Sequence, residues 1–385
     1  MIQGVSSASQ AINDAKKIVV KIGSALLVQD DGEVRRLWLD SLADDIAALK
    51  DQGKEVLIVS SGAIAVGRSH LGLGLKSLRL EEKQAAAATG QIRLAHAYQA
   101  TLARHEITVS QILLTLDDTE ARRRHLNARN TIETLLKLGA VPIINENDTV
   151  ATSEIRFGDN DRLGARVATM IGADLLILLS DIDGLYSNDP RKDANAIYFP
   201  VVEAITAEIE DMAGEPPVGY SSGGMITKIA AAKIATASGC HMLIANGKEA
   251  NPLSKVASGV QRASLFLANT EPQAARKSWI AGSLKSDGVV VVDQGAVKAL
   301  GNGRSLLPAG VTAVRGSFRR GDAIVIEGPN GEELARGLVA YNADEVALIC
   351  GKKSGEVASI LGYEGREELI HRDDLVLTGL KKKKR

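Results

Sequence analysis

Two lysines stand beside glycines in segments that suit the binding of phosphate groups. Lys21 lies near the end of an apolar run, two residues before Gly23, and Lys228 lies one helical turn beyond the pair Gly223-Gly224. Glycine lets backbone N–H groups approach a phosphate closely, and an ammonium group supplies the opposite charge. The segment around Lys228 lacks the spacing of a Walker A sequence, so it does not indicate a P-loop.

Carboxylates, amides and hydroxyls form three further clusters. Asn145-Glu-Asn-Asp148 follows one apolar run, Ser60-Ser61-Gly62 ends another, and Gly158-Asp-Asn-Asp161 precedes a helical pattern. These side chains could hold the ammonium or carboxylate groups of a small substrate. The alternative is simple capping of the helices that follow, by Ser60 or Ser61 in one case and by the acids before Arg162 in the other.

Short apolar runs alternate with helical patterns over the first three-quarters of the chain. The runs predict strands at Ile18–Ile22, Glu55–Ser60, Ile107–Leu114, Val141–Ile144, Leu175–Leu179 and His241–Ile244. The helical patterns cover Trp38–Gln52, Glu81–Arg104, Asp117–Leu138, Arg162–Ile171 and Met225–Ser238. This alternation predicts an α/β fold, a three-layer αβα sandwich with a mainly parallel sheet. The polar clusters then lie at carboxyl ends of strands, where such sheets bind ligands.

The pattern changes near Ala281 to short apolar runs separated by glycines and turn residues. Runs at Val289–Val292, Ala323–Ile326, Leu338–Val339 and Val346–Ile349 predict the strands of a small β-rich domain. We place the boundary near Ser286, which gives domains at residues 16–283 and 287–380.

Composition excludes several classes of protein. A chain of 385 residues is too long for one ordinary domain, and its 46 basic and 47 acidic residues create no net field toward nucleic acid or membrane. Cys240 and Cys350 cannot form a disulfide framework, and both read as small core residues in strand-like runs. No apolar segment reaches the ~20 residues of a membrane helix, and residues 1–15 show no secretory pattern. We therefore expect a cytoplasmic protein.

Taken in order, the motifs resemble the amino acid kinase family. They are Lys-Ile-Gly-Ser at 21–24, Val-Ser-Ser-Gly-Ala-Ile-Ala-Val-Gly at 59–67, Asn-Glu-Asn-Asp at 145–148, Gly-Asp-Asn-Asp at 158–161, Asp-Gly-Leu-Tyr at 183–186 and Gly-Gly-Met-Ile-Thr-Lys at 223–228. Within that family the chain is most similar to the members that phosphorylate glutamate and carry a C-terminal PUA domain. Residues 305–308, 361–363 and 371–374 share in this likeness. Ser60 and Ser180 depart from it, because threonine is often expected there.

The resemblance implies an enzyme that uses ATP to phosphorylate the side-chain carboxylate of L-glutamate. The product would be γ-glutamyl phosphate, the entry to proline biosynthesis. It implies that Lys21 and Lys228 hold the transferred phosphoryl group and that Asp161 orients both. Glutamate would be held by Ser61, Asp148 and Asn160. ATP would contact Lys21, Ser180, Asp181, Ser222, Gly223, Gly224, Met225, Ile226, Thr227 and Lys228. Mg²⁺ is expected with ATP, and its protein ligands are left open.

The resemblance also implies regulation and partners. It indicates proline as a feedback inhibitor, a homo-oligomer (dimer or tetramer), and transfer of the product to a γ-glutamyl phosphate reductase. The nearest alternative is phosphorylation of acetylglutamate, aspartate or uridylate on the same fold, which the appended β-rich domain disfavours. A second alternative is an RNA-binding protein, because PUA domains occur in RNA-modifying proteins. The balanced charge and the 3% of aromatic residues argue against RNA binding.

Overall fold

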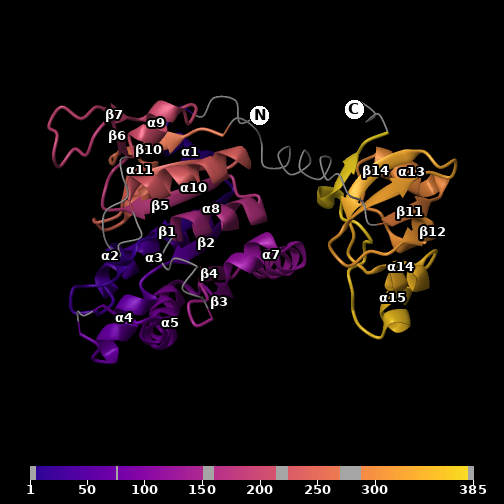
Figure 1. Cartoon of the computed structure of the whole chain (residues 1–385), viewed down its shortest axis with the longest axis horizontal. Helices are drawn as coiled ribbons and strands as arrows, with labels where there is room; N and C mark the ends of the chain where they lie inside the picture. The colour runs from indigo at the N-terminus through magenta and orange to yellow at the C-terminus, as the bar shows by residue number, and fades with distance from the viewer. Residues whose placement is uncertain (1–5, 75–76, 151–159, 214–223, 269–287, 380–385) are drawn as a thin grey trace. The chain divides into compact units, whose positions relative to one another are not determined.

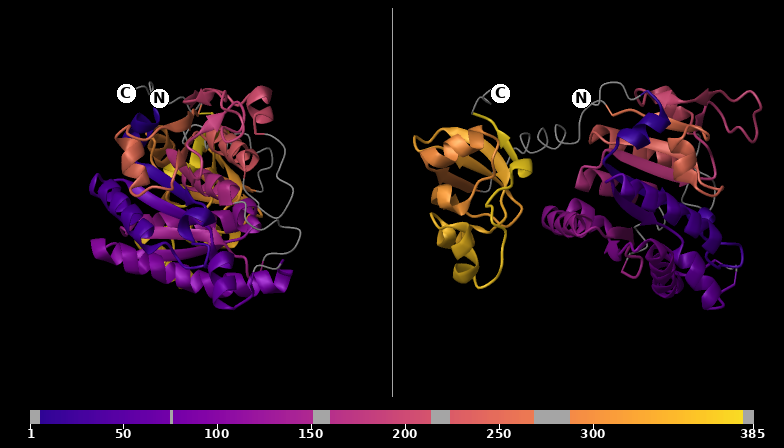
Figure 2. Two further views of the ribbon diagram at one scale, coloured as in Figure 1. Left: turned by 90° about the vertical axis from the view of Figure 1, so that its left-hand side faces the viewer. Right: turned by 180° about the vertical axis from the view of Figure 1, so that it is seen from behind.

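The chain consists of two compact units, Met1–Pro272 and Gln273–Arg385. The computed structural model describes residues 6–74, 77–150, 160–213, 224–268 and 288–379. Each unit carries its own sheet and its own helices (Figure 1 and Figure 2). No helix within these described ranges is both long and apolar enough to cross a bilayer. The predicted domain boundary near Ser286 lies outside the described residues.

An eight-stranded sheet with the order β3-β4-β2-β1-β5-β9-β10-β8 forms the middle layer of the first unit. Its strands are β1 (Lys17–Ile22), β2 (Glu55–Ser60), β3 (Val109–Leu114), β4 (Val141–Glu146), β5 (Leu175–Ser180), β8 (Val201–Val202), β9 (His241–Asn246) and β10 (Ala263–Phe266). Only the pairing of β9 with β10 is antiparallel among these strands. A separate antiparallel ribbon joins β6 (Leu185–Tyr186) to β7 (Tyr198–Phe199). The predicted mainly parallel sheet is thereby confirmed.

Helices cover both faces of this sheet. They are α1 (Ala8–Asp14), α2 (Ser24–Leu27), α3 (Arg36–Asp51), α4 (Ala63–His70), α5 (Leu80–Leu102), α6 (Leu116–Glu120), α7 (Arg122–Lys137), α8 (Asn160–Ile171), α9 (Ala207–Asp211), α10 (Met225–Ala237) and α11 (Pro252–Ala257), with a 3₁₀ turn at Ala103–His105. Ile18, Val20 and Ile22 of β1 enter one apolar core, and Val19 enters the other. Because side chains alternate along a strand, Lys21 shares the face of Val19, which α8 and α10 cover. These two helices lie side by side in Figure 1.

One predicted helix of this unit proves to be two. The pattern at Asp117–Leu138 corresponds to α6 and α7, which meet at Ala121, where the backbone is extended (φ −71°, ψ 113°). Thr115 and Asp118 form a capping box that gives α6 its own start. Local capping thus divides a segment whose apolar pattern reads as continuous.

The second unit is built on a five-stranded sheet with the order β12-β11-β13-β14-β15. Its strands are β11 (Gly288–Val292), β12 (Val311–Gly316), β13 (Ala323–Glu327), β14 (Glu333–Leu338) and β15 (Leu375–Leu377). Its helices are α13 (Gln294–Gly301), α14 (Ala343–Ile349) and α15 (Ser354–Leu361), with 3₁₀ turns at Pro308–Gly310 and Arg372–Asp374. Inward residues of β11 and β13 make a core of their own with all three helices, as a small β-rich domain requires.

The strand predicted at Val346–Ile349 is wrong, because these residues form the second half of α14. Asn342 accepts a hydrogen bond from the Glu345 backbone N–H, and the Glu345 carboxylate accepts one from Asn342. This capping box favours a helix despite the β-branched residues that follow. Cys350 therefore follows a helix rather than lying in a strand-like run, whereas Cys240 is buried just before β9.

Candidate active site

The carboxyl ends of four central strands lie level with one another. Ile22 at the end of β1 pairs with Ser60 at the end of β2, and Leu179 pairs with Ala245 one residue before β5 and β9 both end. The segments that follow these strands therefore leave the sheet at one edge. In a parallel α/β sheet this edge is where ligands bind.

A lysine pair shares one carboxylate at this edge. Lys21 Nζ lies 2.8 Å from Asp161 Oδ1, and Lys228 Nζ lies 3.0 Å from Asp161 Oδ2. The three residues come from β1 and from the first turns of α8 and α10. All three are buried, with 8%, 2% and 7% of their surfaces exposed in chain order. The structure thus brings together three residues that are far apart in the sequence.

The charges of this group do not cancel. Burial by itself raises the pKa of Asp161, but the charges of Lys21 and Lys228 outweigh burial and hold that pKa well below its ordinary value of 3.8. Asp161 is therefore ionised at neutral pH, and the group of two ammonium ions and one carboxylate has a net charge of +1. Each ammonium has three N–H donors, so donors remain for an anionic ligand.

The start of α10 fixes Lys228 in this arrangement. Thr227 Oγ1 lies 2.8 Å from Asp161 Oδ2 and 2.9 Å from the Gly224 carbonyl oxygen, which ties the first turn of α10 to α8. Gly224, Met225 and Ile226 open the same turn, with Ile226 exposed. Ser222 and Gly223, which the sequence also places in the ATP site, lie outside the described residues.

A second polar group surrounds Asn160, the first residue of α8. Asn160 Nδ2 lies 2.8 Å from Ser61 Oγ, 2.8 Å from the Ser60 carbonyl oxygen and 3.1 Å from Asn145 Oδ1. Ser61 is held in a turn that needs glycine next, because Gly62 has a left-handed backbone (φ 99°). Gly62 is also the N-cap of α4, which has no side-chain cap, so capping by Ser60 or Ser61 is excluded.

Asp148 lies just beyond β4 and is also buried. Burial, with a smaller contribution from the charge of Glu146, raises the pKa of Asp148 to about 7. No hydrogen bond within the described ranges joins Asp148 to Ser61 or Asn160. The carboxyl group is thus poised to gain a positively charged partner, which would restore its ionised form.

Ser180 and Asp181 end β5 and begin the loop that follows. Ser180 is buried and its hydroxyl donates to Asp181 Oδ1 at 3.2 Å, whereas Asp181 is exposed and pairs with Arg191 at 3.5 Å. Two residues further along the chain, Asp183 and Tyr186, contact Arg262, which precedes β10. Arg262 lies 2.5 Å from the Asp183 carboxylate and 2.6 Å from the Tyr186 hydroxyl. These contacts hold the loop between β5 and β6 in place beside the edge of the sheet.

Helix α5 supports the site through two residues that the sequence does not single out. The Tyr98 hydroxyl lies 3.0 Å from Ser60 Oγ, and Gln91 Oε1 accepts a hydrogen bond of 2.8 Å from Asn145 Nδ2. Gln91 and Tyr98 are separated from these partners by 54 and 38 positions, and no motif marks them. Helix α4 packs beside α5 in Figure 1.

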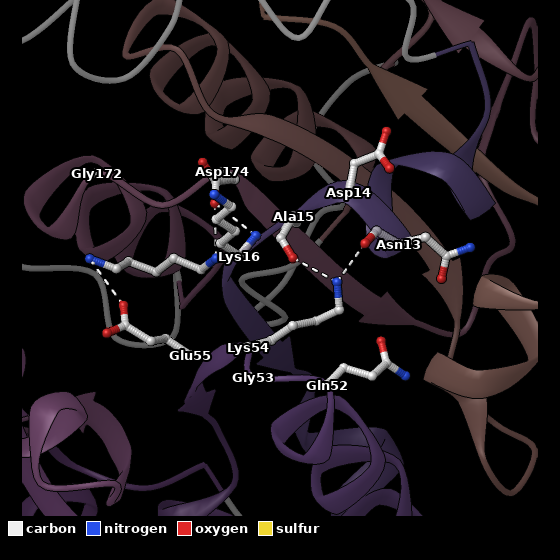
Figure 3. A pocket seen from close by; sticks show the side chains of 11 residues that line it. Asn13, Asp14, Ala15, Lys16, Gln52, Gly53, Lys54, Glu55, Gly172 and Asp174 are labelled. Atoms are coloured by element: carbon white, nitrogen blue, oxygen red, sulfur yellow. Dashed lines mark hydrogen bonds and ion pairs between the residues drawn. The ribbon is translucent and has the colours of Figure 1, made fainter.

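A pocket of about 600 Å³ lies at the opposite, amino-terminal edge of the same sheet (Figure 3). There Lys54 Nζ donates to the carbonyl oxygens of Ile12, Asn13 and Ala15 at 3.2, 2.6 and 2.8 Å. Asp174 Oδ2 accepts from the backbone N–H groups of Lys16 and Lys17, both at 2.9 Å. Lys54 and Asp174 thus hold the end of α1 and the start of β1 in place.

The chain is similar to known proteins in both of its units. Residues 16–246 match the amino acid kinase family, and residues 288–361 match the PUA domain. A protein named glutamate 5-kinase from Paramagnetospirillum magneticum is 62% identical over 366 residues, which are 95% of this chain and 98% of that protein. One of the same name from Rhizobium johnstonii is 61% identical over 363 residues, 94% and 93% of the two chains. A crystal structure of UMP kinase from Ureaplasma parvum has a TM-score of 0.47 and 17% identity, over 66% of this chain and 98% of that one.

Proposed function

The chain belongs to the amino acid kinase family, and we infer that it transfers the terminal phosphoryl group of ATP to the side-chain carboxylate of glutamate. The observation that carries this inference is the buried pair of lysines on Asp161, at the edge of the sheet where ligands bind. The product is γ-glutamyl phosphate, which places the enzyme at the first step of proline biosynthesis. The likeness to glutamate 5-kinases over nearly the whole chain supports this choice over the sister activities.

Lys21 and Lys228 stabilise the phosphoryl group during transfer. The acceptor carboxylate has an ordinary pKa of about 4.3, so it is already a nucleophile at neutral pH and needs no general base. Phosphoryl transfer then depends on alignment and on stabilisation of the charge on the moving group. Asp161 holds the two ammonium groups in fixed positions, so little reorganisation is required when the charge develops.

Ser61, Asn160 and Asp148 hold glutamate. An ionised Asp148 attracts the α-ammonium group of an amino acid, and the Asn160 amide and the Ser61 hydroxyl offer hydrogen bonds to its polar ends. The raised pKa of Asp148, about 7, supports this role, because a buried carboxyl group with no cationic partner among the described residues is suited to receive a cation.

ATP lies across the start of α10 and the end of β5. The first turn of α10 presents backbone N–H groups and the positive end of the helix dipole, which favour phosphate. We assign this contact to Gly224, Met225, Ile226 and Thr227 together with Ser222 and Gly223, and we assign Ser180 and Asp181 to the nucleotide from the other side.

Mg²⁺ enters with ATP, bound to its phosphates. Within the described ranges no three His, Cys, Asp or Glu side chains are grouped as a metal cage. Mg²⁺ keeps several waters and commonly uses one or two carboxylates besides the phosphates, so a single protein carboxylate beside the ATP phosphates would suit it. Asp181 is an exposed carboxylate at this edge that can serve so. The ion would neutralise charge on the phosphates.

We propose that residues 16–283 form the kinase domain and residues 287–380 the PUA-like domain, and that catalysis resides in the first, because every residue assigned above precedes Ile229. Proline, which shares an amine and an α-carboxylate with glutamate, inhibits by overlap with the glutamate site. A homo-oligomer, transfer of the product to a reductase, and residence in the cytoplasm complete the proposal.

The test is a screen of acceptors with the purified full chain. ATP and Mg²⁺ are combined in turn with glutamate, aspartate, N-acetylglutamate and UMP, and ADP release is measured together with trapping of acyl phosphate by hydroxylamine. We expect glutamate to give both signals with the highest kcat/KM. Faster reaction with another acceptor, or no acyl phosphate with glutamate, would refute the proposal.

A further inference from the structure

Arg262 lies beside an aromatic ring at the carboxyl edge of the kinase sheet. It comes directly before β10, whose first residue, Ala263, pairs with Ala245 near the end of β9. The Arg262 guanidinium lies over the Tyr198 ring, 4.7 Å from the ring centroid, and 59% of the Arg262 side chain is exposed. A planar cation that rests on one aromatic ring and keeps an exposed surface is suited to stack on a second ring.

Hydrogen bonds hold the plane of this guanidinium in one position. Its Nε lies 2.5 Å from the Asp183 carboxylate, and its Nη2 lies 2.6 Å from the Tyr186 hydroxyl. Tyr186 also donates to Asp183 at 2.8 Å, and the Leu185 backbone N–H of the same ribbon donates to Ser264 Oγ of β10 at 2.8 Å (Figure 1). Guanidinium N–H groups point outward within the plane, so these partners take its edge and a ligand would meet its face.

The distance along the sheet from the lysine pair to Arg262 suits a nucleotide. Strands β1, β5, β9 and β10 are neighbours in this order, and they are level at this edge through the pairs Ile22–Leu179, Leu179–Ala245 and Ala245–Ala263. Neighbouring strands lie about 4.8 Å apart, so β1 and β10 are separated by about 14 Å. An extended nucleoside triphosphate has a similar length. ATP with its terminal phosphate at the lysine pair can therefore place its base at Arg262.

We propose that the adenine base of ATP stacks on Arg262, with Tyr198 on the other side of the guanidinium. This inference rests on the proposed function, because it takes the lysine pair as the site of the terminal phosphate. Stacking needs a planar surface rather than a point charge, so lysine at position 262 does not replace arginine. The contact strengthens nucleotide binding and takes no part in transfer of the phosphoryl group. It therefore affects KM for ATP rather than kcat.

The test compares Arg262→Lys with wild type in the full chain. Lysine keeps a positive charge beside Asp183 but has no planar surface. We expect Arg262→Lys to raise KM for ATP about tenfold, which is within the range found when one stacking partner of a nucleic-acid base is removed. Its kcat and its KM for glutamate should stay within about twofold of wild type.

Inorganic tripolyphosphate, which has no base, separates stacking from placement of the loop that carries Asp183. Its inhibition constant against ATP should be the same in Arg262→Lys and wild type. Arg104→Lys serves as the matched control and should keep the wild-type KM for ATP, because Arg104 is also partly exposed and pairs with the carboxylates of Asp40 and Asp44. Should Arg262→Lys be too unstable to assay, Arg262→Met takes its place, since methionine is unbranched and has no planar cation.

Two outcomes would overturn the inference. Either KM for ATP in Arg262→Lys stays at the wild-type value, which would show that the charge beside Asp183 suffices, or ATP and tripolyphosphate weaken by the same factor, which would show that the loop has moved. Both outcomes leave the proposed function intact as long as wild type forms acyl phosphate from glutamate. A wild-type enzyme that forms none refutes the proposed function itself, so the two failures are distinguishable.

Discussion

Buried or partly buried lysines lie at both edges of the kinase sheet, but they have different partners at the two edges. At the amino edge Lys54 donates to backbone carbonyl oxygens, and Lys17 Nζ lies 3.2 Å from the Ile171 carbonyl oxygen and 3.3 Å from the Glu55 carboxylate. At the carboxyl edge Lys21 and Lys228 share the single carboxylate of Asp161. Lys17 and Lys21 even belong to the same strand.

We propose that a lysine serves as a ligand site only where its neighbours leave a net positive charge and unused N–H donors. Carbonyl groups that end α1 take up the donors of Lys54, and this stabilises the fold. One carboxylate between two ammonium groups leaves a net positive charge that burial makes more effective. Loops can provide such an unequal arrangement at the carboxyl edge, because successive strands all lead into that edge.

The largest expected effect separates Lys228 from Lys54. Lys228→Met should lower kcat about 10²–10³-fold, because it removes one electrostatic contact to the transferred group while keeping the apolar stem. KM for glutamate should change far less. Steady-state kinetics at saturating ATP check this, and a kcat near that of wild type would remove Lys228 from the mechanism.

Replacing the shared carboxylate should damage the fold as well as the rate. Asp161→Asn leaves two buried ammonium groups without an opposite charge, at a cost of about 3–5 kcal/mol in the free energy of unfolding. The low folded-state pKa of Asp161 means that its contribution is present above pH 4 and is lost only at lower pH, so the loss should be constant between pH 6 and 9. Urea unfolding at several pH values measures it, and unchanged stability would contradict the account.

Asp148 should behave in the opposite sense, because its raised pKa marks an unfavourable buried charge. The folded state holds the proton more tightly than the unfolded state, so this group destabilises the fold increasingly from about pH 4 to pH 7 and fully above it. Asp148→Asn should therefore stabilise the protein without ligands by roughly 1–3 kcal/mol at pH 8 and by little at pH 4.

The same group predicts a pH dependence of glutamate binding. In wild type KM for glutamate should rise as pH falls below about 7, since Asp148 must lose a proton to receive the ammonium group. In Asp148→Asn it should be high and independent of pH. A wild-type KM that is flat between pH 5.5 and 8, measured beside a flat KM for ATP, would argue against this contact.

The smallest effect on activity is expected at the amino edge. Lys54→Met removes hydrogen bonds that satisfy the last carbonyl groups of α1, so it should lower the free energy of unfolding by about 1–2 kcal/mol. Its kcat should remain within about twofold of wild type. A loss of kcat in a folded Lys54→Met protein would show that the two edges are not separate in function.

Much of the fold could be read from the sequence because its signals are local. Alternating patterns place six of the eight strands of the kinase sheet to within a few residues, whereas the short strands β8 and β10 are not predicted. The clusters at Lys21, Asp148 and Lys228 each lie at the end or start of an element. The helix at Val346–Ile349 was missed because a capping box at Asn342 outweighs the strand propensity of its residues.

The details of the site could not be read, because they depend on tertiary packing. Gln91 reaches Asn145 only because α5 lies against β4 in the folded unit, and Tyr98 reaches Ser60 in the same way. Thr227 belongs to the predicted ATP segment, yet its contact with Asp161 depends on how α8 and α10 pack. Such contacts carry no sequence signal of their own.

We propose that the shared carboxylate at the carboxyl edge makes Lys21 and Lys228 catalytic. The most direct measurement compares kcat for acyl phosphate formation in Lys21→Met and Lys17→Met, two variants of one strand. The account predicts a decrease of about 10²–10³-fold in Lys21→Met and a value within about twofold of wild type in Lys17→Met, with both proteins folded. Similar kcat values in the two variants, or a nearly normal kcat in Lys21→Met, would contradict it.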